Sequence, residues 1–495
     1  MENNQTKEKL LAEIGRLKKE LKKKKRYGLV WDEEKNPEEV VEMCKEKLPV
    51  IKEVKGKEIV SDKNKPFNLL IEGDNYHALS VLNYTHKGKI DVIYIDPPYN
   101  RGGDFKYNDD YVDREDPYRH SKWLSFMAKR LQLAKNLLKK TGVIFISIDD
   151  NEVSQLRLLL DNNIFSELLS VGPIIWQKAS GGGNAKQIVI GHEFILCYGN
   201  QDIVFTQKNY KHDNKKFDKS KKYISKNGEW YFINDDVVRK YFGKYPKGVE
   251  RRCEYEDLLE YKGKEQKKEI DNKLKTGEFI LVPNPKNSKK HFICALEKIG
   301  GLRMVLYSII QGIFNAEGKE DLVKDGLLED AFDYPKPVRL IKLLLDSIGN
   351  KEAVVLDFFA GSGTTAKAVL ELNEEDGGNR KLILCTNNEG NICTEVCYPR
   401  VRNVIKGHKV GKELIPGLGG NLKYFKTDFV DYKEATDKNK IRLTEEAIEM
   451  LCVKEGTFEE VENRVGFKIF KNHDHYAGII FDQLAIKEFK KSISN

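Results

Sequence analysis

The tetrapeptide Asp96-Pro97-Pro98-Tyr99 combines residue types that can hold an amino group. It follows the apolar run Ile90–Ile95, which is typical of a buried strand. Proline lacks a backbone N–H and fixes φ, so we expect both proline carbonyls to be free to point into a cavity beside the Asp96 carboxylate. Tyr99 adds a ring face for stacking. Together these groups suit the exocyclic amine of a flat base.

Such an amine needs help to react, because its lone pair is delocalised into the ring. Two acceptors that bind its two hydrogens favour a pyramidal nitrogen, which can attack a sulfonium methyl group in line. The alternative is a Pro-Pro loop after an edge strand, with no chemical role.

A second motif, Phe359-Ala360-Gly361-Ser362-Gly363-Thr364-Thr365, follows the strand-like run Ala353–Leu356. Its glycines permit a tight turn and close backbone approach where a helix N-terminus faces a ligand. The nucleotide fingerprint G-x-G-x-x-G is absent because Ala366 follows Thr365, and no Gly-Lys-Ser/Thr follows to make a P-loop. A neutral turn of small residues suits a ligand without phosphates, such as the amino-acid part of S-adenosylmethionine. A Gly-rich turn with no ligand is the alternative.

Strands alternate with helices over residues 66–200 and again from about Pro335, which favours an α/β fold with a doubly wound sheet. Ligands bind such sheets at the carboxyl ends of the strands. The two motifs therefore predict one site assembled from distant parts of the chain.

Composition limits the other possibilities. The chain has 495 residues, 40% hydrophobic and 33% charged, which indicates an ordered protein of several domains. It contains no apolar run of membrane-spanning length, and its charged N-terminus is not a secretory signal. The eight cysteines lack paired short spacing, so we expect no metal and a reduced, cytoplasmic protein.

The basic charge of the chain is concentrated between the two motifs. Residues 201–290 contain 23 Lys/Arg against 15 Asp/Glu, an excess of eight that equals the net charge of the whole chain. Aromatic residues are interleaved with these cations, a pattern that serves phosphate and base contacts. A solvated lysine-rich surface would give the same composition. The lysines singled out here are Lys215, Lys216, Lys221 and Lys222.

A basic helix is predicted over residues 4–26. Leu10, Ile14, Leu17 and Leu21 form an apolar seam about two heptads long, too short to dimerise alone. We expect an arm that supports a larger interface, and hence a homodimer.

The order and spacing of several segments resemble the β-class DNA amino-methyltransferases, and more closely the modification (Mod) subunit of type III restriction–modification systems. The resemblance covers residues 25–200 and 330–430 and rests on Ile71–Leu79, Asp96–Asn100, Tyr118–Met127, Phe145–Glu152, Lys336-Pro337 and Asp357–Thr365. It implies a Rossmann-like, circularly permuted S-adenosylmethionine-dependent methyltransferase sheet. The implied domains are a helical arm (1–60), a catalytic half (61–200), a target-recognition domain (201–330), a cofactor half (331–410) and a small α+β domain (411–495).

The resemblance also implies residue roles. Asp96, Pro97, Pro98 and Tyr99 match the catalytic tetrapeptide, with Tyr99 stacking on the extruded base. Glu389 is similar to the acid that holds the ribose hydroxyls of S-adenosylmethionine, and Asp74 to the residue near its adenine. Lys336 and Pro337 match a motif that closes over its methionine end. The turn that holds this end corresponds to Asp357, Phe359, Gly361, Ser362, Gly363 and Thr364.

The implied activity is methylation of adenine N6 in duplex DNA, with the target base flipped out of the helix. Aspartate at position 96 favours adenine N6 over cytosine N4, where relatives more usually have serine. Cytosine C5 chemistry is disfavoured because the chain has no Pro-Cys dipeptide. The alternatives are a cytosine-N4 enzyme, or a recognition subunit without catalysis that positions a nuclease.

Modification subunits usually continue well past the point that corresponds to Asn495. We therefore expect either a shortened subunit that pairs with a restriction (Res) subunit, or a stand-alone methyltransferase of the same lineage.

Overall fold

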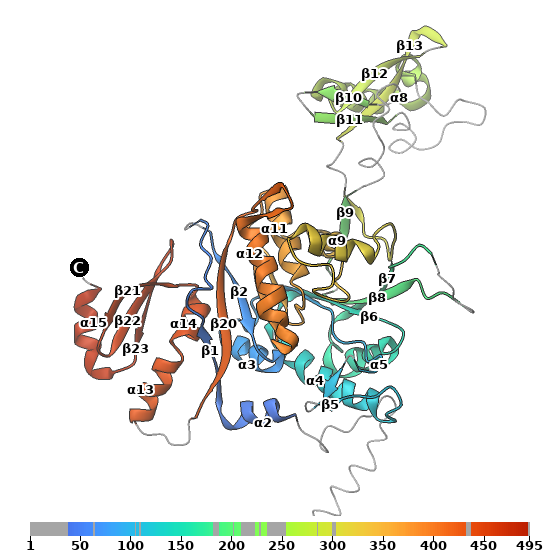
Figure 1. Cartoon of the computed structure of the whole chain (residues 1–495). Coiled ribbons are helices and arrows are strands. Elements are labelled where there is room, and N and C mark those ends of the chain that lie inside the picture. Colours follow the sequence, from blue (N-terminus) through green and yellow to red (C-terminus); the bar gives the residue numbers. More distant parts are fainter. Residues whose placement is uncertain are drawn as a thin grey trace, which may run out of the picture. The chain divides into compact units, whose positions relative to one another are not determined.

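The computed structural model describes residues 38–62, 65–103, 105–107, 110–181, 188–200, 202–208, 223–226, 229–234, 254–284, 286–298, 303–431 and 437–493. The chain divides into two compact units, Met1–Ile203 with Tyr307–Asn495, and Val204–Leu306 (Figure 1). The predicted helix over residues 4–26 and the lysines Lys215, Lys216, Lys221 and Lys222 lie outside the described residues.

A ten-stranded sheet forms the centre of the larger unit. Its six neighbouring strands β20 to β6 are parallel, whereas β8 runs antiparallel to both β6 and β7. Strands from both halves of the sequence are adjacent, which confirms the predicted doubly wound, permuted α/β sheet. The order is β1 (Leu48–Glu53), β20 (Asn421–Val430), β2 (Phe67–Glu72), β17 (Lys381–Thr386), β16 (Val354–Asp357), β3 (Ile90–Ile95), β6 (Leu138–Ile148), β8 (His192–Gly199), β7 (Leu169–Gln177) and β15 (Ile309–Ile310).

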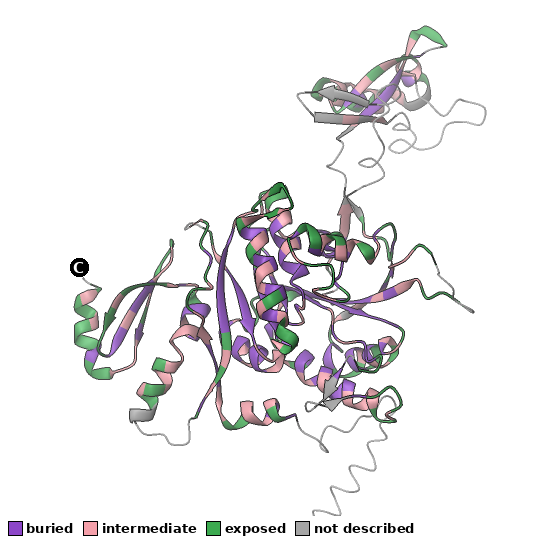
Figure 2. Cartoon of the chain, in the orientation of Figure 1, coloured by how far each residue is buried: buried purple, intermediate pink, exposed green. Residues whose placement is uncertain are grey.

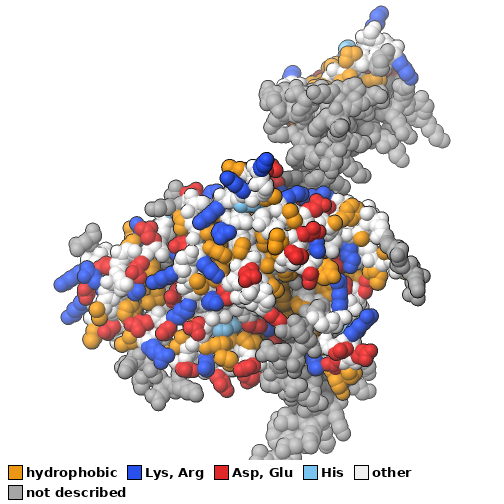
Figure 3. Space-filling model, viewed as in Figure 1, with side chains coloured by type: hydrophobic (Ala, Val, Ile, Leu, Met, Phe, Trp, Pro, Cys, Tyr) orange, Lys and Arg blue, Asp and Glu red, His pale blue; other side chains and the backbone are white. Residues whose placement is uncertain are grey.

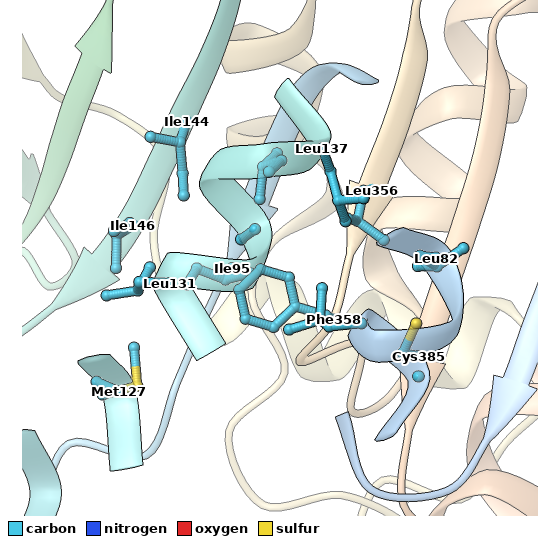
Figure 4. Close-up of a cluster of buried hydrophobic side chains, with 14 of the residues drawn as sticks. Leu82, Ile95, Met127, Leu131, Leu137, Ile144, Ile146, Leu356, Phe358 and Cys385 are labelled. Carbon is cyan, nitrogen blue, oxygen red and sulfur yellow. The ribbon is translucent and has the colours of Figure 1, made fainter. Parts of the chain in front are cut away.

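Helices cover both faces of this sheet (Figures 1 and 2). Helices α3 (Asn75–Thr85) and α4 (Arg119–Leu137) share one buried cluster with Leu356 and Phe358, and Figure 4 shows the Phe358 ring at its centre. Alternate strand residues point to the opposite face, where Val355 and Leu384 are fully buried. There α11 contacts β17 and packs with the two helices beside it. These three helices are α10 (Val338–Ile348), α11 (Thr364–Asp376) and α12 (Tyr398–Lys406).

Three segments differ from the boundaries expected from the sequence. Strand β1 lies within the predicted arm and β20 within the predicted C-terminal domain, yet the two pair with each other and extend the central sheet. Leu422 and Tyr424 of β20 are fully buried, as in an interior strand. Residues 307–330, expected in the insert, belong to the larger unit, where β15 pairs with β7 and α9 (Ala316–Lys324) precedes α10.

The remaining described elements lie outside the central sheet. In the smaller unit, α8 and a four-stranded sheet enclose a core of Leu258, Ile270, Phe279, Ile293 and Ala295. No helix in the described part of the chain combines the length and apolarity needed to cross a membrane.

The bounds in the smaller unit are β9 (Thr206–Lys208), β10 (Tyr223–Lys226), β11 (Glu229–Asn234), α8 (Leu258–Thr276), β12 (Phe279–Asn284), β13 (Asn287–Lys298) and β14 (Arg303–Val305). In the larger unit they are α2 (Glu39–Glu46), β4 (Lys106–Tyr107), β5 (Asp110–Tyr111), α5 (Val153–Leu159), β18 (Gly407–Val410), β19 (Glu413–Pro416), α13 (Asp437–Glu446), α14 (Ile448–Glu455), β21 (Glu459–Arg464), β22 (Phe467–Lys471), β23 (Tyr476–Ile480) and α15 (Ile486–Ser492).

Candidate active site

The two sequence motifs begin at the carboxyl ends of neighbouring parallel strands. In the register of β3 and β16, Ile93 lies opposite Leu356. Strand β3 ends one residue before Asp96, and β16 ends at Asp357, two residues before Phe359. Because parallel strands point the same way, both motifs reach the same edge of the sheet.

Asp96 is held by two donors. The Tyr99 hydroxyl donates to its Oδ1 at 2.8 Å, and the Lys336 ammonium donates to its Oδ2 at 2.8 Å. Burial raises the pKa of Asp96, Lys336 opposes the rise, and the neighbouring Glu193 adds to it, leaving the pKa above its ordinary value. Burial alone would lower the pKa of Lys336, but Asp96 and Glu193 together raise it. Lys336 therefore stays a cation beside the carboxylate.

The backbone of the tetrapeptide differs from the expectation at Pro98. Its carbonyl is not free, because it accepts a hydrogen bond from the Trp123 indole Nε1 at 2.8 Å. Trp123 is fully buried on α4 and anchors the loop. Sequence reasoning missed this contact because it joins a helix and a loop that are separate in the sequence. Of the two proline carbonyls, Pro97 is then the candidate for a second acceptor beside Asp96.

Glu193, at the start of β8, was not predicted as a site residue. Its side chain is only 6% exposed, and its Oε2 lies 3.2 Å from the Tyr99 hydroxyl and 3.4 Å from the Lys336 ammonium. Lys178 and Arg101 reach its other oxygen, at 3.2 and 3.6 Å. Its signal in the sequence is weak, since an acid in the first residues of an apolar strand is more often at the surface.

Burial, Asp96 and Glu193 raise the pKa of Tyr99 well above its ordinary value, so its hydroxyl remains a donor. The Arg101 guanidinium carbon and the Lys336 ammonium nitrogen each lie 4.9 Å from the centroid of the Tyr99 ring.

The glycine turn adopts the conformation that its glycines permit. Gly361 and Gly363 have φ of 49° and 78°, in the left-handed region, and Gly363 is the residue before α11. A Cβ on Gly361 would lie 3.1 Å from the Phe332 ring, so space beside the turn is tight. The Asp357 carboxylate holds the turn by accepting from the Phe359 N–H at 3.0 Å and the Thr365 hydroxyl at 2.5 Å.

Arg400 of α12 supports the same turn from inside the protein. It is fully buried, and its Nη1 donates to the Ser362 carbonyl at 3.3 Å and to the Thr364 hydroxyl at 2.9 Å. Its Nε donates to Asp325 at 2.8 Å, and Asp325 also pairs with Lys367 of α11. The structure therefore assigns Ser362 and Thr364 to a network that fixes the turn, with side chains contributed by three helical segments.

Asp74 precedes α3, where it accepts from the Tyr76 N–H at 2.7 Å. Arg130, 1% exposed, donates to Asp74 at 3.2 Å, to Asn75 at 2.5 Å and to the buried Glu38 at 2.8 Å. The Asn75 amide in turn donates to the Phe358 carbonyl at 3.0 Å. Asn75 therefore links the segment after β2 to the segment after β16. Arg130 lies on the buried face of α4, at helical spacing from Met127 and Ala134, which is a readable signal for a buried partner.

The other predicted residues lie along the same edge. Glu389 is exposed, three residues after β17 ends, and Glu72 at the end of β2 pairs with Thr386 of β17. Pro337 directly precedes α10, and the half-buried Phe359 ring lies 6.1 Å from that of Phe126. Predicted residues thus follow four adjacent strands: β2, β17, β16 and β3. No group of acidic, histidine and cysteine side chains that could hold a metal occurs within the described part of the chain.

A doubly wound sheet that carries an Asp-Pro-Pro-Tyr tetrapeptide and a glycine-rich turn at adjacent strand ends is the architecture of a DNA amino-methyltransferase. The chain belongs to the N6_N4_Mtase family, described as DNA methylase, whose profile matches residues 90–396, more than half of the chain. The resemblance drawn from the sequence is thereby confirmed.

The curated relatives include the Mod subunit of the type III restriction-modification enzyme StyLTI from Salmonella typhimurium. It is 34% identical over 68% of this chain and 55% of its own length. The type II methyltransferase M.KpnI from Klebsiella pneumoniae is 28% identical over 73% of this chain and 88% of its own length. Among solved structures, the cytosine-N4-specific PvuII DNA methyltransferase is 11% identical, with a TM-score of 0.38 over 72% of this chain and 93% of its own. The chain spans between a half and two thirds of the length of the type III relatives that it matches.

Proposed function

We propose that this protein is a site-specific DNA methyltransferase that transfers a methyl group from S-adenosylmethionine to adenine N6 in duplex DNA. The observation that carries the proposal is the adjacency of Asp96 and the Gly361–Gly363 turn at the ends of the paired strands β3 and β16. An amine acceptor and a methyl donor that bind at these two places meet at one edge of the sheet.

On the base side, Asp96 and the Pro97 carbonyl would accept the two hydrogens of the adenine amine. Trp123 keeps the loop in place through the Pro98 carbonyl. Tyr99 would stack on the base, which is flipped out of the duplex because its amine is otherwise inaccessible. Bound in this way, the amine nitrogen is held with its lone pair directed at the methyl donor.

On the cofactor side, the residues fit S-adenosylmethionine, which supplies an electrophilic methyl group. The backbone of the turn from Phe359 to Gly363 would hold the methionine end, where the N-terminus of α11 favours a carboxylate. Asp357 and Arg400 keep this turn in its conformation. Glu389 would accept the ribose hydroxyls and Asp74 would lie at the adenine, while Lys336 and Pro337 close the site between the cofactor and Asp96.

Sequence recognition would fall to the inserted domain. On the face of the larger unit in Figure 3, basic and acidic side chains are interspersed, which gives no single basic surface there. The excess of Lys/Arg in residues 201–290 supports the insert as the DNA-binding part. We expect the protein to modify DNA in a bacterial cytoplasm, as a homodimer. Its type III relatives are named as Mod subunits of restriction-modification enzymes, which supports association with a restriction subunit.

The test is to express the full chain in a host without DNA methylases and to identify modified bases by mass spectrometry and sequencing. We expect N6-methyladenine at one asymmetric sequence, and its loss in Asp96→Ala but not in a control at the exposed Asp330, Asp330→Ala. Removal of an acceptor that acts in the transition state should lower kcat by about 10²–10³-fold.

Two results would contradict the proposal. N4-methylcytosine as the sole product would identify a cytosine enzyme. Specific DNA binding without any methylated base, and unchanged by Asp96→Ala, would identify a recognition subunit instead.

A further inference from the structure

Both oxygens of the Asp96 carboxylate are already used by protein donors. Oδ1 accepts from the Tyr99 hydroxyl and Oδ2 from the Lys336 ammonium, each at 2.8 Å. If Asp96 holds the target amine, as the proposed function requires, the amine competes with these two donors for the carboxylate, and a donor that moves aside leaves one oxygen fully to the amine. A buried donor left without an acceptor costs about 1–3 kcal/mol, so a replacement acceptor is needed.

Glu193 is placed to be that acceptor. Its Oε2 lies within 3.4 Å of both donors, at 3.2 Å from the Tyr99 hydroxyl and 3.4 Å from the Lys336 ammonium. Each donor is therefore already directed between two carboxylates, and a small rotation transfers it from Asp96 to Glu193.

The surroundings of Glu193 suit this role. Lys178 and Arg101 reach its Oε1, which leaves Oε2 directed at the two donors. The carboxylate is nearly buried, so little water competes for these donors.

We propose that Glu193 is a positioning residue that takes over the Tyr99 hydroxyl and the Lys336 ammonium when the target amine binds Asp96. No bond to carbon forms or breaks in this exchange. Its result is a vacant acceptor on Asp96, a Tyr99 ring still fixed for stacking, and a lysine still paired. The inference rests on the proposed function of Asp96 and adds a role for a strand that neither sequence motif includes.

The test compares Glu193→Gln with the wild-type full chain on a duplex that contains the mapped target site. Glutamine keeps the shape of the side chain but loses its charge, so the donors should remain on Asp96. We expect an unchanged Kd for S-adenosylmethionine and at least a tenfold lower single-turnover rate. Glu193→Asp, which keeps the charge, should restore part of the rate.

The pH profile separates this role from a merely structural one. Glu193 raises the pKa of Asp96. Its neutralisation should therefore move the acid limb of the rate profile to lower pH. The matched control is Asp161→Asn. The Asp161 carboxylate accepts from the hydroxyl of Tyr198 at 2.6 Å, and Tyr198 lies on β8 five residues after Glu193. This control should leave the acid limb in place.

A double-mutant cycle with Tyr99→Phe supplies a second measurement, because this variant removes the hydroxyl that Glu193 would accept. We expect the two losses of rate to be non-additive. Additive losses, an unmoved acid limb or a wild-type rate in Glu193→Gln would overturn the inference. If the wild-type chain itself methylates no DNA, the proposed function fails, a result distinct from these.

Discussion

The Lys336 ammonium lies 2.8 Å from the Asp96 carboxylate, across 240 residues of sequence. This ion pair joins the segment before α10 to the loop after β3, and so connects the two halves of the sheet at the candidate site. Lys336 is 8% exposed and Asp96 25% exposed, which leaves part of the carboxylate open to an incoming group.

The first prediction concerns the charge of this pair. Lys336 lowers the pKa of Asp96, so Lys336→Met should raise it. Only the ionised Asp96 carboxylate can accept from both the target amine and the Tyr99 hydroxyl. Because a higher pKa of Asp96 means that it ionises at higher pH, the acid limb of kcat should move to higher pH. We expect a loss of about 10²-fold in kcat near neutral pH.

The control for this measurement is Lys342→Met. Lys342 is a part-buried lysine of α10 that pairs with Glu371 and Glu375, so its loss tests the general effect of removing a lysine ion pair. An equal shift of the acid limb in both variants would show that the Lys336 contact has no special effect on Asp96.

The second prediction concerns Asp357, whose pKa burial raises from 3.8 to about 7 against the hydrogen bonds from Thr365 and Phe359. Between these two values the folded state holds a proton that the unfolded state has released. This contribution to the free energy of unfolding is complete below pH 3.8 and is lost as the pH rises to about 7. Asp357→Asn keeps an acceptor and a donor in place but does not titrate.

We therefore expect Asp357→Asn to gain stability relative to the wild type as the pH rises through this window, by at most about 1.4 kcal/mol per pH unit. Urea unfolding at several pH values measures the difference. A difference that is constant with pH, like that expected for the exposed control Asp330→Asn, would contradict the raised pKa.

The third prediction concerns the support of the glycine turn. Arg400→Lys keeps a cation for Asp325, but an ammonium group cannot reproduce the planar set of donors that reaches Ser362 and Thr364. We expect about tenfold weaker binding of S-adenosylmethionine, or about 1.4 kcal/mol, measured by calorimetry. Arg402→Lys at an exposed position of the same helix should bind as the wild type does.

The sequence predicted those parts of the fold that depend on local pattern. The runs before Asp96 and Asp357 are apolar apart from Asp91, and both became buried strands. The pairing of β1 with β20 was missed because a strand partner from the other end of the chain leaves no local signal. The contacts of Lys336, Trp123 and Glu193 were missed for the same reason, since each joins separate segments.

Arg130 is different, because its place on the apolar face of α4 could have been read from helical spacing. The tertiary structure was needed to show its partners, Glu38, Asp74 and Asn75. The sequence alone therefore proposed residues for the chemistry, whereas the groups that hold these residues in place emerged only from the packing.

The last prediction concerns the lysines of the insert. If Lys215, Lys216, Lys221 and Lys222 contact phosphates, replacing all four with alanine should weaken DNA binding and reduce the slope of log Kd against log salt. Each phosphate contact that is lost reduces this slope by about one. The matched control replaces four exposed lysines outside the insert, Lys409, Lys412, Lys487 and Lys491, and removes the same net charge. If the two quadruple variants lose slope equally, the effect is one of overall charge; an unchanged slope in the insert variant would show that these four lysines do not contact the DNA backbone.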